Sequence, residues 1–157
     1  MEYIRSDRKN NDCVFCDQLA KTDSPENLII HRGSLSFVIL NRFPYTSGHI
    51  MIVPYEHRPS LEDLEVETRS DMMEMTAIAL RILKAEYHAQ GFNIGVNIGE
   101  ASGAGILAHF HMHIVPRWGG DTNFMSTLAQ TRVIPEALEV TYWRIRRAWE
   151  NKHESKS

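Results

Sequence analysis

A chain of 157 residues with 43% hydrophobic and 24% charged residues has the composition and length of one globular domain. The net charge of −3 gives no reason to expect nucleic-acid binding, and no apolar run approaches the roughly 20 residues that span a membrane. Two cysteines are too few for a disulfide framework, and residues 1–7 lack the apolar core of a signal peptide, so we expect a cytoplasmic protein.

The first half of the chain reads as a series of short elements. Residues 1–12 are polar and are expected to form a loose arm, followed by a short knuckle and helix over 13–21. Pro44 and Gly48 mark a turn. Apolar runs on either side of it predict strands at 28–31, 35–40 and 49–53.

The second half begins with a long amphipathic helix. Ser60–Asp63 resembles a helix start, apolar residues then recur at helical spacing from about Thr68 to Gln90, and Gly91 is expected to end the helix. A strand at 92–98, a glycine-rich loop, a histidine-bearing strand and a helix over 135–150 that starts with proline complete the chain. Short connections between the early strands predict an antiparallel sheet packed with two helices, an α+β fold.

Three histidines alternate with apolar residues in the run His109-Phe110-His111-Met112-His113-Ile114-Val115, which Pro116 closes. In a β-strand the three imidazoles would line one face, while Phe110, Met112 and Ile114 would be buried on the other. In a helix His109 and His113 would share a face and His111 would point away. The β-branched residues and the closing proline favour the strand. Three imidazoles on one face indicate acid, base, nucleophile or metal-ligand chemistry.

The run resembles the signature of the histidine triad (HIT) superfamily, and the similarity extends well beyond it. Asn41, the strand Ser47–Pro54, the segment Asn93–Gly105 and the residues Val115–Trp118 fall where that family has its elements. The resemblance covers roughly residues 13–150. It implies a single HIT domain over residues 1–157, with an antiparallel sheet of about five strands, a long central helix, a C-terminal helix and a tail at 151–157.

The resemblance also assigns catalytic roles to the histidines. In that family the middle histidine attacks the phosphorus attached to a nucleoside and forms a nucleotidyl-histidine, which makes His111 the nucleophile here. His113 resembles the partner that contacts phosphate and stabilises the leaving charge. His49 matches a supporting histidine on a neighbouring strand, although taken alone it would be read as a buried, hydrogen-bonded histidine.

The glycine-rich loop at residues 99–105 resembles the α-phosphate cradle of the family. In that cradle, small residues let backbone N–H groups approach phosphate oxygens. Many relatives have Gln followed by Ser or Thr just before the triad, where this sequence has Gly105 and Ile106. That departure disfavours a phosphoramidase. The contacts expected from the loop are Ser102, Gly103, Gly105 and Ile106.

Three further residues match substrate contacts of relatives. Asn41 and Asn97 match positions that contact ribose or phosphate, although either is also a common turn residue. Arg117 is expected to reach the distal phosphates, because its guanidinium suits phosphate oxygens.

The pair Cys13-Val14-Phe15-Cys16 indicates either redox chemistry or half of a zinc site. No βαβ unit surrounds it, which disfavours a thioredoxin-like role. In zinc-bearing HIT proteins the site is completed by the histidine that ends a Pro-x-x-His segment and by the first triad histidine. The resemblance therefore supplies His57 and His109 as ligands, with His31 as a rival, and implies structural zinc with no organic cofactor.

The resemblance further implies a homodimer, since relatives pair through the long helix and the strand before the triad. Met72, Met73, Met75 and Ile78 carry more apolar surface than one packed face requires. Phe92, Ile94, Val96 and Ile98 lie on one side of the predicted strand. The alternative is that the methionines simply fill the core of one chain.

Trp118, Asp121, Asn123 and Phe124 extend the resemblance toward the branch that cleaves dinucleoside polyphosphates, although Trp118 and Phe124 could equally pack a dimer interface. The implied activity is that of a nucleotidyl hydrolase or phosphorylase, acting on a substrate such as diadenosine tetraphosphate. The alternatives are a purine nucleoside phosphoramidase and, from another class, a non-catalytic zinc-containing nucleotide-binding protein. The expected partner is a small-molecule nucleotide, with neither nucleic acid nor a membrane.

Overall fold

The computed structural model describes residues 13–121 and 135–154. Their five strands form one sheet in the order β1-β2-β3-β5-β4, with every neighbouring pair antiparallel. The α+β fold expected from the sequence is confirmed. The strands are β1 (Ile29–Arg32), β2 (Ser36–Leu40), β3 (Ile50–Pro54), β4 (Gly91–Gly95) and β5 (Met112–Arg117).

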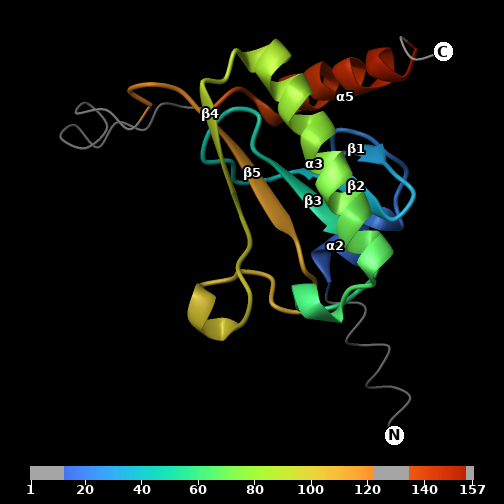
Figure 1. The fold of residues 1–157 in the computed structure, drawn as a ribbon. Coiled ribbons are helices and arrows are strands. Elements are labelled where there is room, and N and C mark those ends of the chain that lie inside the picture. Colours follow the sequence, from blue (N-terminus) through green and yellow to red (C-terminus); the bar gives the residue numbers. More distant parts are fainter. Residues whose placement is uncertain (1–12, 122–134, 155–157) are drawn as a thin grey trace, which may run out of the picture.

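In the described part of the chain, three helices and two short 3-10 turns accompany the sheet. The long helix α3 (Val66–Tyr87) crosses one face and packs on β2 and β3, and α5 (Leu138–Glu154) packs against α3 and β1 (Figure 1). The remaining elements are α2 (Val14–Leu19), η1 (Leu61–Asp63) and η2 (Glu100–Ser102). None of the described helices is long and apolar enough to cross a membrane.

The core lies between α3 and the central strands. All five residues of β2 and all five of β3 are buried, so both faces of these strands are covered. Met72 and Met75 are 1% and 6% exposed and belong to this core. The other two apolar residues that the sequence analysis assigned to a dimer contact on α3 are less buried: Ile78 is partly buried and Met73 is 59% exposed.

Several predicted boundaries are wrong. The helix ends at Tyr87, because His88 adopts a left-handed conformation (φ 51°, ψ 38°), and Gly91 instead begins β4. Ser60–Asp63 does not open α3 but leads into the separate turn η1, and Pro135 precedes α5 without being its first residue. The end of α3 differs from the prediction because the chain reverses at His88, and helical periodicity does not indicate such a reversal.

The histidine run is only partly a strand. β3 pairs with β5 at Ile50–Ile52, and this ladder stops at Met112, so His109 and His111 precede the strand. The backbone N–H of Phe110 instead donates to the carbonyl oxygen of Arg58 at 2.7 Å. The predicted burial of the alternate residues is confirmed for Phe110 and Ile114, while Met112 is partly buried.

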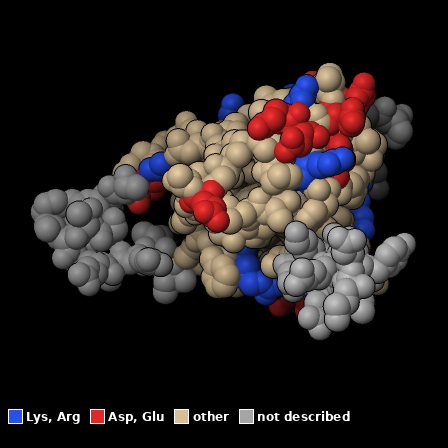
Figure 2. All heavy atoms as spheres, turned by 90° about the horizontal axis from the view of Figure 1, so that it is seen from below, with Lys and Arg blue, Asp and Glu red and all other residues tan. Residues whose placement is uncertain are grey.

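One edge of the sheet and one loop stand apart from the core. β4 forms the edge, and Ile94 and Ile98 are 45% and 40% exposed there. The loop after β4 carries η2 away from the sheet (Figure 1). Figure 2 shows both acidic and basic side chains on the face seen from below. η1 and the start of α3 expose Glu62, Asp63, Glu65 and Glu67.

Candidate functional site

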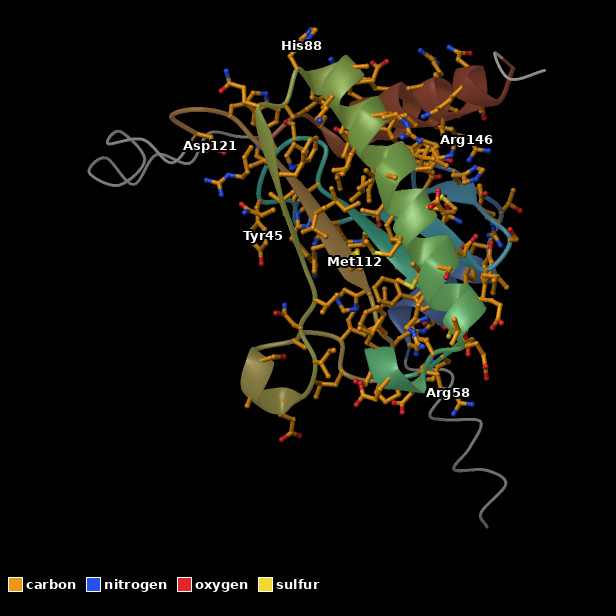
Figure 3. The ribbon with its side chains drawn as sticks, in the orientation of Figure 1. Tyr45, Arg58, His88, Met112, Asp121 and Arg146 are labelled. Carbon is orange, nitrogen blue, oxygen red and sulfur yellow. The ribbon has the colours of Figure 1, made fainter. Side chains whose placement is uncertain are left out.

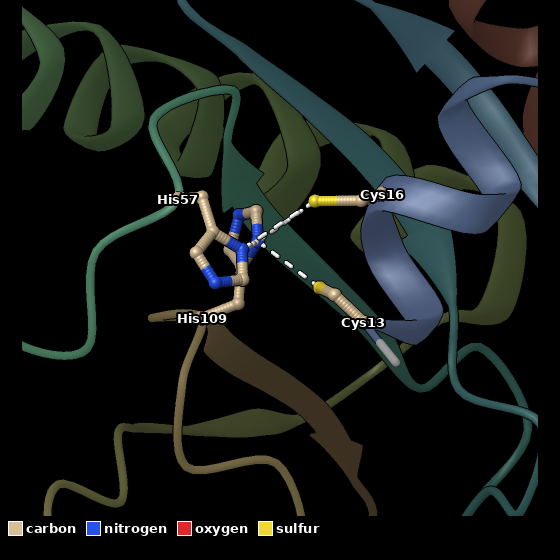
Figure 4. Close-up of side chains that lie close together, drawn as sticks. All are labelled: Cys13, Cys16, His57 and His109. Carbon is tan, nitrogen blue, oxygen red and sulfur yellow. Dashed lines mark hydrogen bonds between the residues drawn. The ribbon is translucent and has the colours of Figure 1, made fainter. Parts of the chain in front are cut away.

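Two cysteines and two histidines from separate segments of the chain converge on one point (Figure 4). Cys13 and Cys16 flank the start of α2, His57 follows β3, and His109 precedes β5. Their four ligand atoms lie within 4.8 Å of one another. The structure therefore brings together the four residues that the sequence indicates as metal ligands. The rival His31 instead lies on β1 and stacks on Trp149 at 5.2 Å.

The separations within this cluster suit a tetrahedral ion. The Sγ atoms of Cys13 and Cys16 lie 3.4 Å from Nδ1 of His109 and of His57 respectively, and the two Nδ1 atoms are 3.1 Å apart. Ligands bound to one zinc at usual bond lengths lie roughly 3.3–3.8 Å apart. The two sulfur–nitrogen separations lie within that range, and the separation of the two Nδ1 atoms lies slightly below it. His109 Nε2–H donates to the carbonyl oxygen of Pro54 at 2.8 Å, which directs the Nδ1 lone pair into the cluster.

The protonation of the cluster also fits a metal site. Burial, followed by the hydrogen bond and charge of Cys13 and the charge of Asp17, raises the pKa of the Cys16 thiol to about 11. Burial lowers the pKa of His109 to about 4, against a smaller opposing effect of its bond to Pro54. The imidazole is thus neutral and ready to coordinate, whereas the thiol must release its proton when a metal binds.

His111 presents a free lone pair. Its Nδ1–H donates to the backbone carbonyl of His109 at 2.9 Å, so Nε2 carries no proton in the neutral ring. The residue is 6% exposed, and burial lowers its pKa while the backbone bond acts in the opposite direction. A buried neutral imidazole with an unprotonated Nε2 has the form of a nucleophile or a base.

A chain of hydrogen bonds fixes the tautomers of His49 and His113. The backbone N–H of Tyr45 donates to His49 Nδ1 at 3.2 Å, so His49 carries its proton on Nε2. That Nε2–H lies 2.9 Å from His113 Nδ1 and donates to it. His113 therefore holds its own proton on Nε2, where it can serve as a hydrogen-bond donor beside His111.

Both members of this pair are neutral. Burial, followed by the charge of His113, lowers the pKa of His49 to about 4. Burial, followed by the charge of His111, lowers the pKa of His113 to about 4. We call the hydrogen-bond chain from the Tyr45 N–H through His49 to His113 the relay. It joins uncharged rings, and protonation of either ring would disrupt it.

Aromatic rings connect the metal cluster to this relay. Phe15, between the two cysteines and 1% exposed, packs on His109 and on His111 at centroid distances of 5.4 and 5.1 Å. The row continues from His111 through His113 and His49 to Tyr45, in steps of 5.0, 5.2 and 5.0 Å. The sequence patterns did not indicate Phe15 or Tyr45 as parts of the site. The position of Phe15 between the cysteines was the available signal, whereas nothing in the local pattern marks Tyr45.

Of the predicted substrate contacts, Asn41 lies at the histidines. Its Nδ2 atom is 3.4 Å from His49 Nε2, and its Oδ1 accepts the backbone N–H of Phe43 at 2.8 Å. The bond to Phe43 holds a turn, which is the alternative role that the sequence left open for this residue. Asn41 therefore lies beside His49 and also at the base of the loop that follows β2.

The glycine-rich loop is not packed against the histidines. A Cβ atom added at Gly99, Gly103 or Gly105 would meet nothing within 4 Å, and Gly99 and Gly103 have φ of +79° and +80°. Ser102 and Asn97 are exposed, and Ser102 Oγ donates to the carbonyl of Gly99 at 2.6 Å. Ile106 differs, because it packs against the core.

Arg117 lies at the end of β5 and is held by neighbouring side chains. Its Nε and Nη2 donate to Asp121 at 2.6 and 3.0 Å, and its Nη1 donates to Asn93 Oδ1 at 2.6 Å. Trp118 is bonded through Nε1 to the carbonyl of Tyr87 at 3.0 Å. Asn123 and Phe124 lie outside the described residues, as do the loose arm and the end of the tail.

The arrangement has counterparts among known proteins. The HIT domain family model matches residues 21–120. The chain is 37% identical to an AP-4-A phosphorylase of Mycobacterium tuberculosis over 132 residues, which cover 84% of this chain and 68% of that protein. It is 28% identical to the asymmetrical bis(5′-nucleosyl)-tetraphosphatase of Schizosaccharomyces pombe, over 59% of this chain and 50% of that protein.

A solved structure has the same fold. A zinc-bound histidine triad family protein from Mycobacterium smegmatis superposes with a TM-score of 0.74 at 28% identity, covering 93% of this chain and 99% of its own. The structure of the present chain contains the predicted sheet, helices and histidine run. The family model spans most of its described core. The chain belongs to the HIT domain family.

Proposed function

We propose that this protein cleaves a dinucleoside polyphosphate, such as diadenosine tetraphosphate, through a covalent nucleotide on His111. The observation that carries the proposal is a pair of contacts at neighbouring rings: His111 Nδ1 lies 2.9 Å from the His109 carbonyl oxygen and His113 Nδ1 lies 2.9 Å from His49 Nε2. These contacts assign an unprotonated Nε2 to His111 and an Nε2–H to His113. The names of the phosphorylase and tetraphosphatase relatives support the class of substrate.

The chemistry follows from these two atoms. His111 Nε2 attacks the phosphorus of the first nucleotide, an N–P bond forms, and the bond to the bridging oxygen breaks with its electron pair on that oxygen. The Nδ1–H bond to the His109 carbonyl stabilises the positive charge that develops on the ring. His113 Nε2–H, held in place by His49, stabilises the negative charge of the leaving polyphosphate.

A second displacement regenerates the enzyme. Water or orthophosphate attacks the phosphorus from the side opposite the N–P bond, the N–P electron pair returns to His111 Nε2, and the proton of the acceptor is released. Asn41, Asn97 and the loop residues Ser102, Gly103, Gly105 and Ile106 are the proposed substrate contacts. A contact between Arg117 and the distal phosphates would require the guanidinium to exchange Asp121 for phosphate.

We propose zinc as the metal of the cluster, held by Cys13, Cys16, His57 and His109. An ion bound by four protein ligands serves structure and has no open position for substrate. By holding the ring of His109, the site would fix the backbone carbonyl that orients His111. Two thiolate ligands would be at risk of oxidation outside a reducing compartment, which supports a cytoplasmic location.

We also propose a homodimer in which β4 pairs with β4 of a second copy. The outer edge of β4 has no neighbouring strand among the described residues, and proteins rarely leave such an edge free. Ile94 on β4 and Ile98 just beyond it, together with Met73 on α3, would supply apolar contacts.

Steady-state turnover tests the activity directly. Diadenosine tetraphosphate, adenosine 5′-phosphoramidate and buffer alone should be compared, with and without orthophosphate. Fastest turnover of the dinucleotide supports the proposal, and stimulation by orthophosphate identifies a phosphorylase. Preference for the phosphoramidate would contradict the proposed substrate class, and binding without turnover of any substrate would favour a non-catalytic nucleotide-binding protein.

A further inference from the structure

The loop between β2 and β3 exposes two aromatic side chains. Phe43 is 81% exposed and Tyr45 is 77% exposed, more than any other large apolar residue that the structure describes. Both residues precede His49 in the sequence, in the same loop between β2 and β3. In Figure 3 Tyr45 points away from the sheet into solvent. Tyr45 packs on His49, and Phe43 is joined through its backbone to Asn41, which lies beside His49. Large apolar side chains exposed next to such a group indicate a contact with a ligand or a partner.

The loop that carries these rings is firmly held. It is tied to β5, to the start of the C-terminal segment and to its own residues, so its two aromatic side chains are presented on a fixed backbone. Rigid aromatic anchors lose little conformational entropy when they bind. The bonds are Phe43 N–H to Asn41 Oδ1, 2.8 Å; Tyr45 N–H to His49 Nδ1, 3.2 Å; Thr46 Oγ1–H to the Pro116 carbonyl, 2.9 Å; and Glu136 N–H to Ser47 Oγ, 2.8 Å.

The position of Tyr45 identifies the side of the substrate that it would meet. Its ring stacks on His49 at 5.0 Å with an interplanar angle of 23°. His49 in turn bonds His113, whose Nε2–H faces the leaving group in the proposed reaction. Tyr45 thus lies beyond His113 in the row of rings that starts at His111, on the side of the departing half of the substrate.

We propose that Phe43 and Tyr45 form a stacking platform for the second nucleobase of a dinucleoside polyphosphate, the base on the departing half. The inference rests on the proposed function. It explains why the protein would prefer a substrate with two nucleosides to one with a single nucleoside. A flat ring is the partner that a nucleobase prefers, and such stacking tolerates different bases. The platform accordingly selects for the presence of a second base, with weak preference for its identity.

The test compares diadenosine tetraphosphate with adenosine 5′-tetraphosphate, which has the same phosphates and lacks the second nucleoside. The measured quantity is the ratio of kcat/KM for the two substrates. We expect Phe43→Ala and Tyr45→Ala each to lower this ratio about tenfold, mainly through KM of the dinucleotide. Tyr45→Phe, which keeps the ring, should preserve the ratio. Tyr45→Ala will also slow both substrates, because its ring supports His49, and the ratio removes that common effect.

Trp143→Ala is the matched control, since Trp143 is a 40% exposed aromatic residue on α5, whose main contacts are with α3 and β1 and not with β5. It should leave the ratio unchanged. A ratio within twofold of the wild type in both alanine variants would overturn the platform. Conversion of a dimer to a monomer by Phe43→Ala, seen by light scattering, would also overturn it, because the ring would then be a contact between subunits.

The experiment distinguishes an incorrect platform from an incorrect proposed function. If the wild type turns over neither substrate, the two affinities are measured by calorimetry instead. Tighter binding of the dinucleotide that is lost in Phe43→Ala supports the platform without catalysis. Equal affinities for the two compounds in the wild type overturn it.

Discussion

His49 Nε2 lies 2.9 Å from His113 Nδ1, and the direction of this hydrogen bond is set by a third group, the backbone N–H of Tyr45. A backbone donor thereby determines which nitrogen of His113 carries a proton. Residues 64 positions apart in the sequence are joined by this bond, and it links the loop after β2 to the histidine run. The relay gives His49 a defined part in the proposed reaction without direct contact with the reacting phosphorus.

Removal of the nucleophile should abolish turnover and leave the fold intact. We expect His111→Ala to lower kcat by roughly a thousandfold or more, because the covalent path is lost, while nucleotide affinity changes little. Rapid-quench labelling with a radioactive dinucleotide should trap nucleotidylated wild-type protein and none of the variant. Near-normal turnover by the variant would refute the covalent mechanism.

Removal of His49 should slow the chemical step. Without its Nε2–H, His113 loses the bond that fixes its tautomer, so we expect His49→Ala to lower kcat about 10–100-fold with little change in KM, the range usual for groups that orient a functional residue. His31→Ala is a suitable control, since His31 stacks on Trp149 and lies outside the relay. Equal effects of the two substitutions would argue against a specific role for His49.

The metal cluster should hold one zinc per chain. Elemental analysis of untagged protein prepared without chelator is expected to give one equivalent, and Cys16→Ser should lose most of it, because a serine oxygen is a poor substitute for thiolate. Removing the metal should lower the thermal midpoint, since binding to the folded state alone stabilises it. Full zinc content in Cys16→Ser, or loss of zinc in His31→Ala, would contradict the assigned ligands.

Acid should destabilise the fold through the relay. Burial lowers the pKa of His49 and of His113 from 6.5 to about 4, so at intermediate pH the unfolded chain binds more protons than the folded one. Stability is then lost as the pH falls from 6.5 toward 4. Imidazole NMR signals should show both rings neutral at about pH 5.5, and His49→Gln should flatten the pH dependence of the unfolding free energy. A pKa above about 6 for either ring would be inconsistent with the relay.

A dimer should form through β4. Light scattering at micromolar concentration is expected to give twice the chain mass of 18.1 kDa. Ile94→Asp should shift the mass toward the monomer, because Ile94 is 45% exposed on the free edge and a carboxylate there would be buried without a partner. Glu100→Gln on η2 is a control for general effects of charge changes in the neighbouring loop. A monomeric wild type would exclude the dimer.

The sequence by itself determined the fold class, the five strands and the ligand types. Apolar runs mark the strands, although the alternating histidine run begins before β5 does, and the Cys13-x-x-Cys16 spacing indicates either redox chemistry or half of a metal site. The histidine run is equally plain in the sequence. These features are local, so they can be read from neighbouring residues.

Only the tertiary structure decided how these groups are connected. Cys13 meets His109 across 96 positions, and β5 begins only at Met112, so His111 lies before the strand and bonds the His109 carbonyl. The tautomer of each histidine depends on one such distant or backbone partner. The bonds of Arg117 to Asp121, and the ring of Phe15 between two histidines, likewise follow from packing. Proton positions are set by the nearest hydrogen-bond partner in space, and a linear pattern does not contain that information.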